Sequence, residues 1–222
     1  MVFEQKVRVL ESGERMQSAS DTFTFKFVTL GEGRVGKSSL LLRFTSDVFD
    51  EVSPPTMVAS FVEKRVNIDS TSILLNLWDT AGQERFHALG PIYYRDADAA
   101  LLVFDITDYD SFSKVKRWIS ELRTLVAEDI PICLAGNKFD LEKEKTVDLN
   151  EAEQYADSVN VKLFWTSALT NKNVEACFLY LARAAVIRAN QLAKEQEDIP
   201  EKLILTTEPD LSKKNEAGEC CV

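Results

Sequence analysis

The sequence predicts an α/β protein of three layers, with helices on both faces of a mainly parallel six-stranded sheet that has one antiparallel edge strand. From Thr22 onward, strand-like and helix-like patterns alternate along the 222 residues, which favours right-handed crossovers and a parallel sheet. The polar segment 69–72 separates two strand patterns and predicts a hairpin, which supplies the antiparallel edge. The glycine-rich segment 31–39 lies between the first strand and the first helix.

The first half of the chain shows each element by its own pattern. Residues 23–30 alternate in polarity, as in a half-buried strand, and a helix follows the glycine-rich segment to about residue 45. Segments 61–68 and 73–78 are the two strands of the hairpin. The apolar run 99–106 is typical of a buried parallel strand.

The second half continues the alternation. Residues 111–127 have apolar side chains at helical spacing, and 130–135 form another buried strand. A short helix at 150–159 and a short strand at 162–165 follow. A long amphipathic helix at 174–193 completes the predicted fold.

Composition limits the function classes. The formal charge of −10 argues against broad nucleic-acid binding, which needs a basic surface, although it does not argue against binding a single nucleotide. No apolar run approaches the roughly 20 residues of a membrane helix. The N-terminal residues carry Glu4, Glu11 and Glu14 and lack an apolar core, so we expect no signal peptide there.

Three regions are expected. Residues 1–21 form a polar N-terminal extension, and 22–193 form one domain of ordinary apolar and charged content. Residues 194–222 contain four lysines against eight acidic residues with little periodicity, which predicts a disordered tail. Cys133 and Cys177 lie in apolar runs and are expected to be buried thiols in a reducing cytosol.

The segment 31–39 carries the first chemical motif, a Gly-x-x-x-x-Gly-Lys-Ser sequence between strand and helix. This is the pattern of a P-loop, in which backbone N–H groups and the positive end of a helix hold phosphates, and it indicates a P-loop NTPase-type fold. Lys37 would reach the β- and γ-phosphates, and Ser38 would bind Mg²⁺. The alternative is a plain glycine turn. The phosphate-contacting residues expected here are Gly33, Arg34, Val35, Gly36, Lys37, Ser38 and Ser39.

A second motif follows the predicted strand 73–78, at the edge of the sheet where ligands collect. Asp79 is placed to hold Mg²⁺ through water. Gly82 could offer its N–H to a γ-phosphate, and Gln83 could orient an attacking water, which makes Gln83 the candidate catalytic residue. The alternative is a strand-end Asp followed by an ordinary turn.

A third motif, at the ends of the last two strands, suits a guanine base. Asp140 would be a buried carboxylate accepting two hydrogen bonds from the base, and Asn137 would face its acceptor edge. The stem of Lys138 could cover the base, and the Ala168 N–H is available to the base carbonyl. Alone, the first of these segments could be an ordinary loop containing Asn.

Together, these motifs resemble a Ras-superfamily small GTPase over about residues 22–193, and segment 78–86 is similar to the Rab branch. Segments 86–95 and 59–61 most resemble its early-endosomal members. The resemblance implies that Thr56 binds Mg²⁺ and the γ-phosphate. It also implies that Phe49 packs on the guanine.

The same resemblance completes the sets of site residues. The aromatic residues that effectors would read are Phe61, Trp78 and Tyr93, with core packing as the alternative. The predicted Mg²⁺ ligands are Ser38, Thr56 and Asp79. The predicted nucleotide contacts outside the P-loop are Phe49, Thr56, Gly82, Asn137, Lys138, Asp140, Ser167, Ala168 and Leu169.

The resemblance implies a GTP/GDP switch that hydrolyses GTP and recruits effectors in endocytic vesicle trafficking. The implied partners are effectors, an exchange factor, a GTPase-activating protein, a GDP-dissociation inhibitor and a Rab escort protein. A monomer is expected on the cytoplasmic face of endosomal and vesicle membranes, cycling through the cytosol. A binding module without useful turnover and a P-loop kinase are the alternatives, although no insertion is large enough for a kinase lid.

The chain departs from the family pattern at four places. Arg34 stands where relatives often have a small residue, Pro54 and Pro55 precede Thr56, and Leu169 stands in place of the usual lysine. The fourth departure is the acidic tail, where a basic stretch would add membrane attraction.

The last residues carry a double cysteine. Cys220 and Cys221 resemble the Rab pattern for two geranylgeranyl groups, whereas a C-a-a-X signal would need cysteine at the position of Glu219. Two lipids give stable anchoring where one gives marginal binding. The alternative is a pair of exposed thiols without a role.

Overall fold

The computed structural model describes residues 23–51, 56, 59–69, 71–80 and 93–197. Its strands form one six-stranded sheet in the order β2-β3-β1-β4-β5-β6. The strands are β1 (Phe23–Leu30), β2 (Ser60–Ile68), β3 (Thr71–Asp79), β4 (Ala99–Asp105), β5 (Ile132–Asn137) and β6 (Lys162–Trp165). The helices are α1 (Lys37–Ser46), α3 (Tyr109–Leu125), the 3₁₀ helix η2 (Phe139–Glu144), α4 (Leu149–Ser158) and α5 (Val174–Glu197).

The strand directions confirm the predicted fold class. β1 lies at the centre and pairs in parallel with β3 on one side and with β4 on the other. β5 and β6 extend the parallel part, whereas β2 pairs with β3 as an antiparallel edge strand. Because the parallel strands all end at the same edge of the sheet, the loops that follow them meet there.

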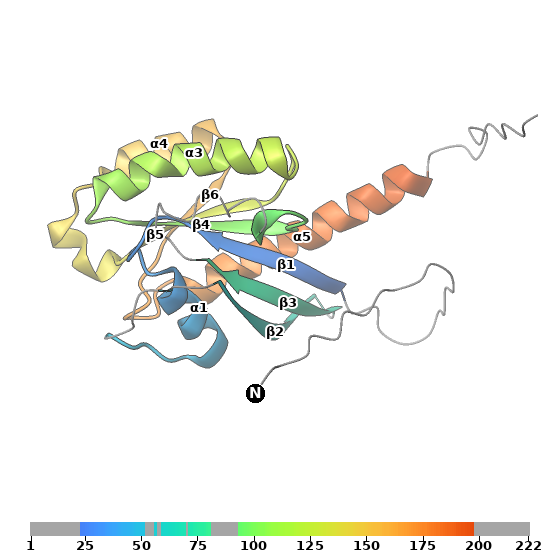
Figure 1. Ribbon diagram of the computed structural model, residues 1–222, viewed down its shortest axis with the longest axis horizontal. Coiled ribbons are helices and arrows are strands. Elements are labelled where there is room, and N and C mark those ends of the chain that lie inside the picture. Colours follow the sequence, from blue (N-terminus) through green and yellow to red (C-terminus); the bar gives the residue numbers. More distant parts are fainter. Residues whose placement is uncertain (1–22, 52–55, 57–58, 70, 81–92, 198–222) are drawn as a thin grey trace, which may run out of the picture.

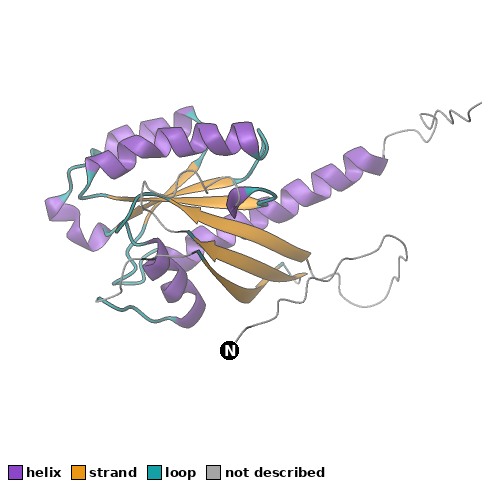
Figure 2. Cartoon of the chain, in the orientation of Figure 1, coloured by secondary structure: helices purple, strands orange, loops and turns teal. Residues whose placement is uncertain are grey.

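Helices cover both faces of the sheet, as predicted (Figure 1, Figure 2). α1 and α5 contact each other and pack on one face, while α3 and α4 lie over the other. The side chains of each face form their own apolar core, one centred on Phe27, Leu75 and Phe178 and the other on Leu102, Phe104 and Phe112. The sheet is therefore a rigid platform with a core on each side.

α3 and α4 are shifted by one or two residues from the predicted helices, and two differences are larger. α5 continues past Ala193 to Glu197, so its last turns lie within the region expected to be a tail. η2 was not predicted, because a short 3₁₀ helix has no room to show an apolar periodicity. Cys133 and Cys177 are buried free thiols, as predicted, with their sulfurs 3.3 Å apart between β5 and α5.

No helix in the parts of the chain that the structure describes is long and apolar enough to cross a membrane.

Phe178 offers a test of the core beneath α1 and α5. Its ring is 1% exposed and stacks on Phe44, with ring centroids 4.2 Å apart. Phe178→Ala should lower the free energy of unfolding by about 3–5 kcal/mol, because a large cavity would remain between the helix and the sheet. Urea unfolding would measure this loss. Leu192→Ala, on the same helix but 39% exposed, is the control and should change stability by less than about 0.5 kcal/mol. Equal losses would contradict the assignment of this core.

Candidate nucleotide-binding site

The predicted phosphate-binding loop lies between β1 and α1, at the edge where the parallel strands end. Two of its glycines have backbone angles that favour glycine, with φ of 141° at Gly31 and 96° at Gly36. A Cβ atom at Gly31 would collide with the Val103 carbonyl oxygen, and one at Gly36 would collide with the Asn137 amide. The loop therefore passes so close to its neighbours that only glycine fits at these two positions.

The first helix begins directly after this loop. Lys37 is its first residue, and the preceding Gly36 provides no side-chain hydrogen bond to cap it. The first N–H groups of a helix have no partners within the helix, and its N-terminus carries partial positive charge. These two properties suit a phosphate group.

Lys37 is folded back over the loop. Its ammonium nitrogen donates hydrogen bonds to the carbonyl oxygens of Gly31 at 3.0 Å and Glu32 at 2.8 Å. Burial lowers the pKa of Lys37 to about 8, although the nearby Asp79 and Glu32 carboxylates act in the opposite direction. A buried ammonium whose hydrogen-bond partners are neutral carbonyls is well suited to meet an anion.

Ser38, Thr56 and Asp79 come together, as the sequence predicts. The Ser38 hydroxyl lies 2.7 Å from the Thr56 hydroxyl and donates to Asp79 Oδ2 at 2.5 Å. Burial raises the pKa of Asp79, whereas the hydrogen bond from Ser38 and the charge of Lys37 lower it. Oxygens from the end of β3, the start of α1 and the segment before β2 thus form one cluster.

This cluster fits a magnesium ion. Asp79 Oδ1 is buried and has no hydrogen-bond partner among the residues that the structure describes. In the same residues no group of three or more His, Cys, Asp or Glu side chains forms a protein-only metal site. One carboxylate with hydroxyls beside a phosphate-binding loop is the donor set that Mg²⁺ uses together with nucleotide phosphates and water.

Asn137 connects the phosphate-binding loop 31–39 to the segment 166–168, which is predicted to contact the base. It is 1% exposed, and its amide nitrogen donates to the Val35 carbonyl at 2.9 Å. Its amide oxygen accepts from the Thr166 hydroxyl and from the Ala168 N–H, both at 3.3 Å. Asn137 thus joins three segments that are far apart in the chain. Thr166 was not among the predicted site residues, because its contact with Asn137 depends on the pairing of β5 with β6.

Asp140 and Ser167 also meet. The Ser167 hydroxyl donates to Asp140 Oδ1 at 2.5 Å, which orients the carboxylate. Asp140 lies on η2 and is exposed, which differs from the buried carboxylate that the sequence suggests. Lys138 forms an ion pair with Asp105, with 2.5 Å between ammonium nitrogen and carboxylate oxygen. Asp105, at the end of β4, is a second residue that sequence reasoning missed.

The other predicted nucleotide contacts differ in how far their side chains or backbone are exposed to solvent. Gly33 and Arg34 are exposed, and Arg34 has a left-handed φ of 66°, a conformation that is uncommon for a residue with a side chain. Leu169 is 45% exposed, and Phe49 and Ser39 are partly buried.

Two of the three predicted effector aromatics are neighbours. Phe61 on β2 is 50% exposed, and its ring centroid lies 5.6 Å from that of Trp78 on β3. Exposure of this size argues against core packing for Phe61. Tyr93 is partly buried. Gly82, Gln83, Pro54, Pro55, Cys220 and Cys221 lie outside the described residues.

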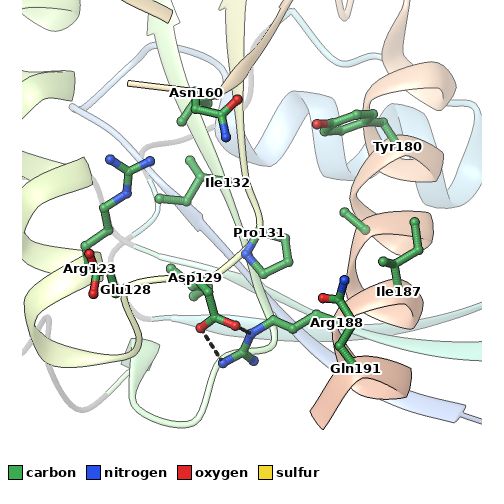
Figure 3. Close-up of a pocket in the computed structure, with 13 residues that line it drawn as sticks. Arg123, Glu128, Asp129, Pro131, Ile132, Asn160, Tyr180, Ile187, Arg188 and Gln191 are labelled. Atoms are coloured by element: carbon green, nitrogen blue, oxygen red, sulfur yellow. Dashed lines mark hydrogen bonds and ion pairs between the residues drawn. The ribbon is translucent and has the colours of Figure 1, made fainter. Parts of the chain in front are cut away.

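A separate cavity of about 320 Å³ lies away from these residues (Figure 3). It is bordered by the segment before β5, by the segment before β6 and by α5, and Arg188 pairs with Asp129 at its edge. None of the residues that line it belongs to the predicted nucleotide site.

Comparison with known proteins agrees with this geometry. The family model described as Ras family matches residues 26–187, and this chain belongs to that family of small GTPases, in its Rab branch. As such it is a GTP hydrolase that acts as a GTP/GDP switch in endocytic membrane trafficking.

Several relatives carry the same name. The chain is 53% identical over 169 residues to Ras-related protein Rab-21 of Bos taurus, covering 76% of each chain. It is 52% identical over 168 residues to the Homo sapiens protein of that name, covering 76% of this chain and 75% of the relative. The Dictyostelium discoideum protein is 50% identical over 167 residues, covering 75% and 79%.

Proposed function

We propose that the loop 31–39, the oxygen cluster around Asp79 and the loops after β5 and β6 bind GTP or GDP with Mg²⁺. The single observation that supports this best is the meeting of Ser38, Thr56 and Asp79 within hydrogen-bond distance at the start of α1. Lys37 and the first N–H groups of α1 would hold the phosphates. Asp140, Asn137 and Ala168 would select guanine.

Ser38, Thr56 and Asp79 are the residues that would hold Mg²⁺. When bound with GTP, Mg²⁺ neutralises negative charge on the phosphate oxygens. Thr56 contacts both Ser38 and Asp79 through its hydroxyl, at 2.7 and 3.4 Å. Thr56 would therefore be held by the same Mg²⁺ that Ser38 binds, and loss of the γ-phosphate would release Thr56.

Gln83 would orient the attacking water, and Gly82 would contact the γ-phosphate. None of the motifs assigns an arginine to the transferred phosphate, and Arg34 is exposed. Intrinsic hydrolysis should therefore be slow, and a GTPase-activating protein would supply a catalytic group in trans. Phe61, Trp78 and Tyr93 would form the surface that effectors read in the GTP state. An exchange factor would restore GTP.

Membrane attachment would come from geranylgeranyl groups on Cys220 and Cys221. A Rab escort protein would present the chain for this modification, and a GDP-dissociation inhibitor would carry it through the cytosol. The working location is the cytoplasmic face of endosomal and vesicle membranes.

Gln83→Leu tests the catalytic proposal. The variant should retain GTP binding, but its hydrolysis in the presence of a GTPase-activating protein should fall by about 10³-fold or more, because leucine cannot hydrogen-bond the water. Single-turnover release of phosphate measures this rate. Gln154→Leu, an exposed position on α4, is the matched control and should hydrolyse normally. Normal stimulated turnover by the Gln83 variant would refute the assignment.

A further inference from the structure

Arg43 joins the two halves of the proposed nucleotide site, although nothing in its sequence context marks it as functional. It lies in the second half of α1, the helix whose first residues would bind phosphate. Its side chain is 15% exposed, so the guanidinium is largely withdrawn from water. A charged group in this position needs several hydrogen-bond acceptors.

The acceptors are supplied from two directions. Arg43 Nε donates to the Ala168 carbonyl at 2.9 Å, and one terminal nitrogen donates to the Leu169 carbonyl at 3.2 Å. The other terminal nitrogen donates to Asp47, reaching its carbonyl at 2.8 Å and its carboxylate at 3.2 Å. One guanidinium therefore fixes a loop that is 125 residues away in sequence against the end of α1.

The loop that Arg43 holds is the one expected to read the base. The Ala168 N–H is the predicted donor to the guanine carbonyl; in this structure it donates to the Asn137 amide oxygen at 3.3 Å, and Arg43 binds the carbonyl of the same residue. The guanidinium carbon also lies 5.9 Å from the ring centroid of Phe49, which is predicted to pack on the guanine. Arg43 thus contacts two of the groups that would surround the base.

A second contact strengthens the connection. The Asn171 amide donates to the Asp47 carboxylate at 3.1 Å, so the end of α1 is tied to the base loop independently of the Arg43 nitrogens. Asp47 itself has a left-handed φ of 54°, which turns the chain out of the helix toward Phe49. The C-terminal end of α1 and the loop 168–171 therefore form one hydrogen-bonded unit, and the Phe49 ring lies beside the Arg43 guanidinium.

We propose that Arg43 is a positioning residue for guanine recognition: it sets the Ala168 N–H and the Phe49 ring relative to the phosphate-binding helix, and so slows nucleotide release. This inference rests on the proposed function of the site. The planar guanidinium donates to three carbonyls and a carboxylate at once, whereas the single ammonium of lysine cannot place its donors in these directions. Arg43→Lys should therefore release nucleotide more slowly than Arg43→Met but faster than the natural chain.

The test compares release of fluorescently labelled GDP from the full chain. Arg43→Met keeps an apolar stem but removes every donor, and it should speed release about tenfold, because two charge-assisted hydrogen bonds to the loop are lost. The same factor is expected with Mg²⁺ and with excess chelator, because Arg43 does not touch the Ser38–Asp79 cluster. Arg188→Gln is the matched control: it removes a bidentate ion pair with Asp129 far from the site and should leave release unchanged.

A base analogue separates positioning from a purely structural role. In 6-thio-GDP a sulfur, a weaker acceptor, replaces the carbonyl oxygen that Ala168 N–H would contact. The natural chain should hold GDP longer than 6-thio-GDP, and Arg43→Met should reduce this difference. Equal acceleration for both nucleotides, or unchanged release, would overturn the role of Arg43. Failure of the natural chain to bind guanine nucleotides would instead refute the proposed function itself.

Discussion

Asp140→Asn is expected to lower the affinity for GDP by about 10⁴-fold, since a site built to hydrogen-bond one base discriminates strongly once its donors and acceptors no longer match that base. Oδ1 of the exposed Asp140 carboxylate accepts a hydrogen bond from the Ser167 hydroxyl at 2.5 Å, which orients the carboxylate. Guanine presents an N–H and an amino group to this carboxylate. An asparagine amide replaces one of the two acceptors with a donor.

The same change should improve binding of xanthosine diphosphate, because xanthine carries a carbonyl where guanine carries the amino group. Equilibrium titration with both nucleotides would measure the reversal. Asp157→Asn, an exposed carboxylate on α4, is the control and should keep the preference for GDP. If Asp140→Asn retained the natural preference, Asp140 would not be the residue that selects the base.

The double variant Cys220→Ser/Cys221→Ser is expected to abolish membrane binding. The tail is acidic, so electrostatic attraction to an anionic membrane surface would not assist attachment. Two lipids are then needed for stable anchoring, since one chain gives only marginal binding. Each single variant should therefore retain weak, reversible binding.

Live-cell localisation of the tagged protein measures this effect, together with flotation on vesicles after prenylation. Glu219→Gln leaves both thiols in place next to the changed position and should localise normally. Unchanged endosomal localisation of the double variant would refute lipid anchoring and would place the membrane contact elsewhere in the chain.

Local pattern was sufficient to predict the strands, because their apolar content and alternation come from burial on one or both faces. β1 and β6 have the predicted limits, and the hairpin of β2 with β3 was expected from its polar turn. The end of α5 was not predictable in this way. Residues 194–197 are charged or polar, and Lys, Glu and Gln are good helix formers, so a change of composition did not stop the helix.

The motifs predicted which residues to group in a site, but not how those residues are connected to one another. Ser38 and Asp79 could be grouped because each belongs to a motif of known chemistry, whereas Thr56 joined them only through the family resemblance. That Asn137 faces the base stays a prediction, and the hydrogen bond from its amide to the Val35 carbonyl, 102 residues away in sequence, was not predicted. Such contacts depend on the order of the strands in the sheet and on the close approach of the Asn137 amide to the backbone of Gly36. Neither can be predicted from the sequence of one segment alone.

The position of β2 at the edge of the sheet has a consequence for self-association. An edge strand that exposes Phe61 and Val62 could pair with the edge of another copy. Charged side chains follow at once: Glu63 and Arg65 are exposed, and the Lys64 ammonium binds the Phe44 carbonyl. These charges oppose strand-to-strand stacking between copies. Phe61 and Val62 can therefore remain exposed at this edge without making the chain prone to aggregate.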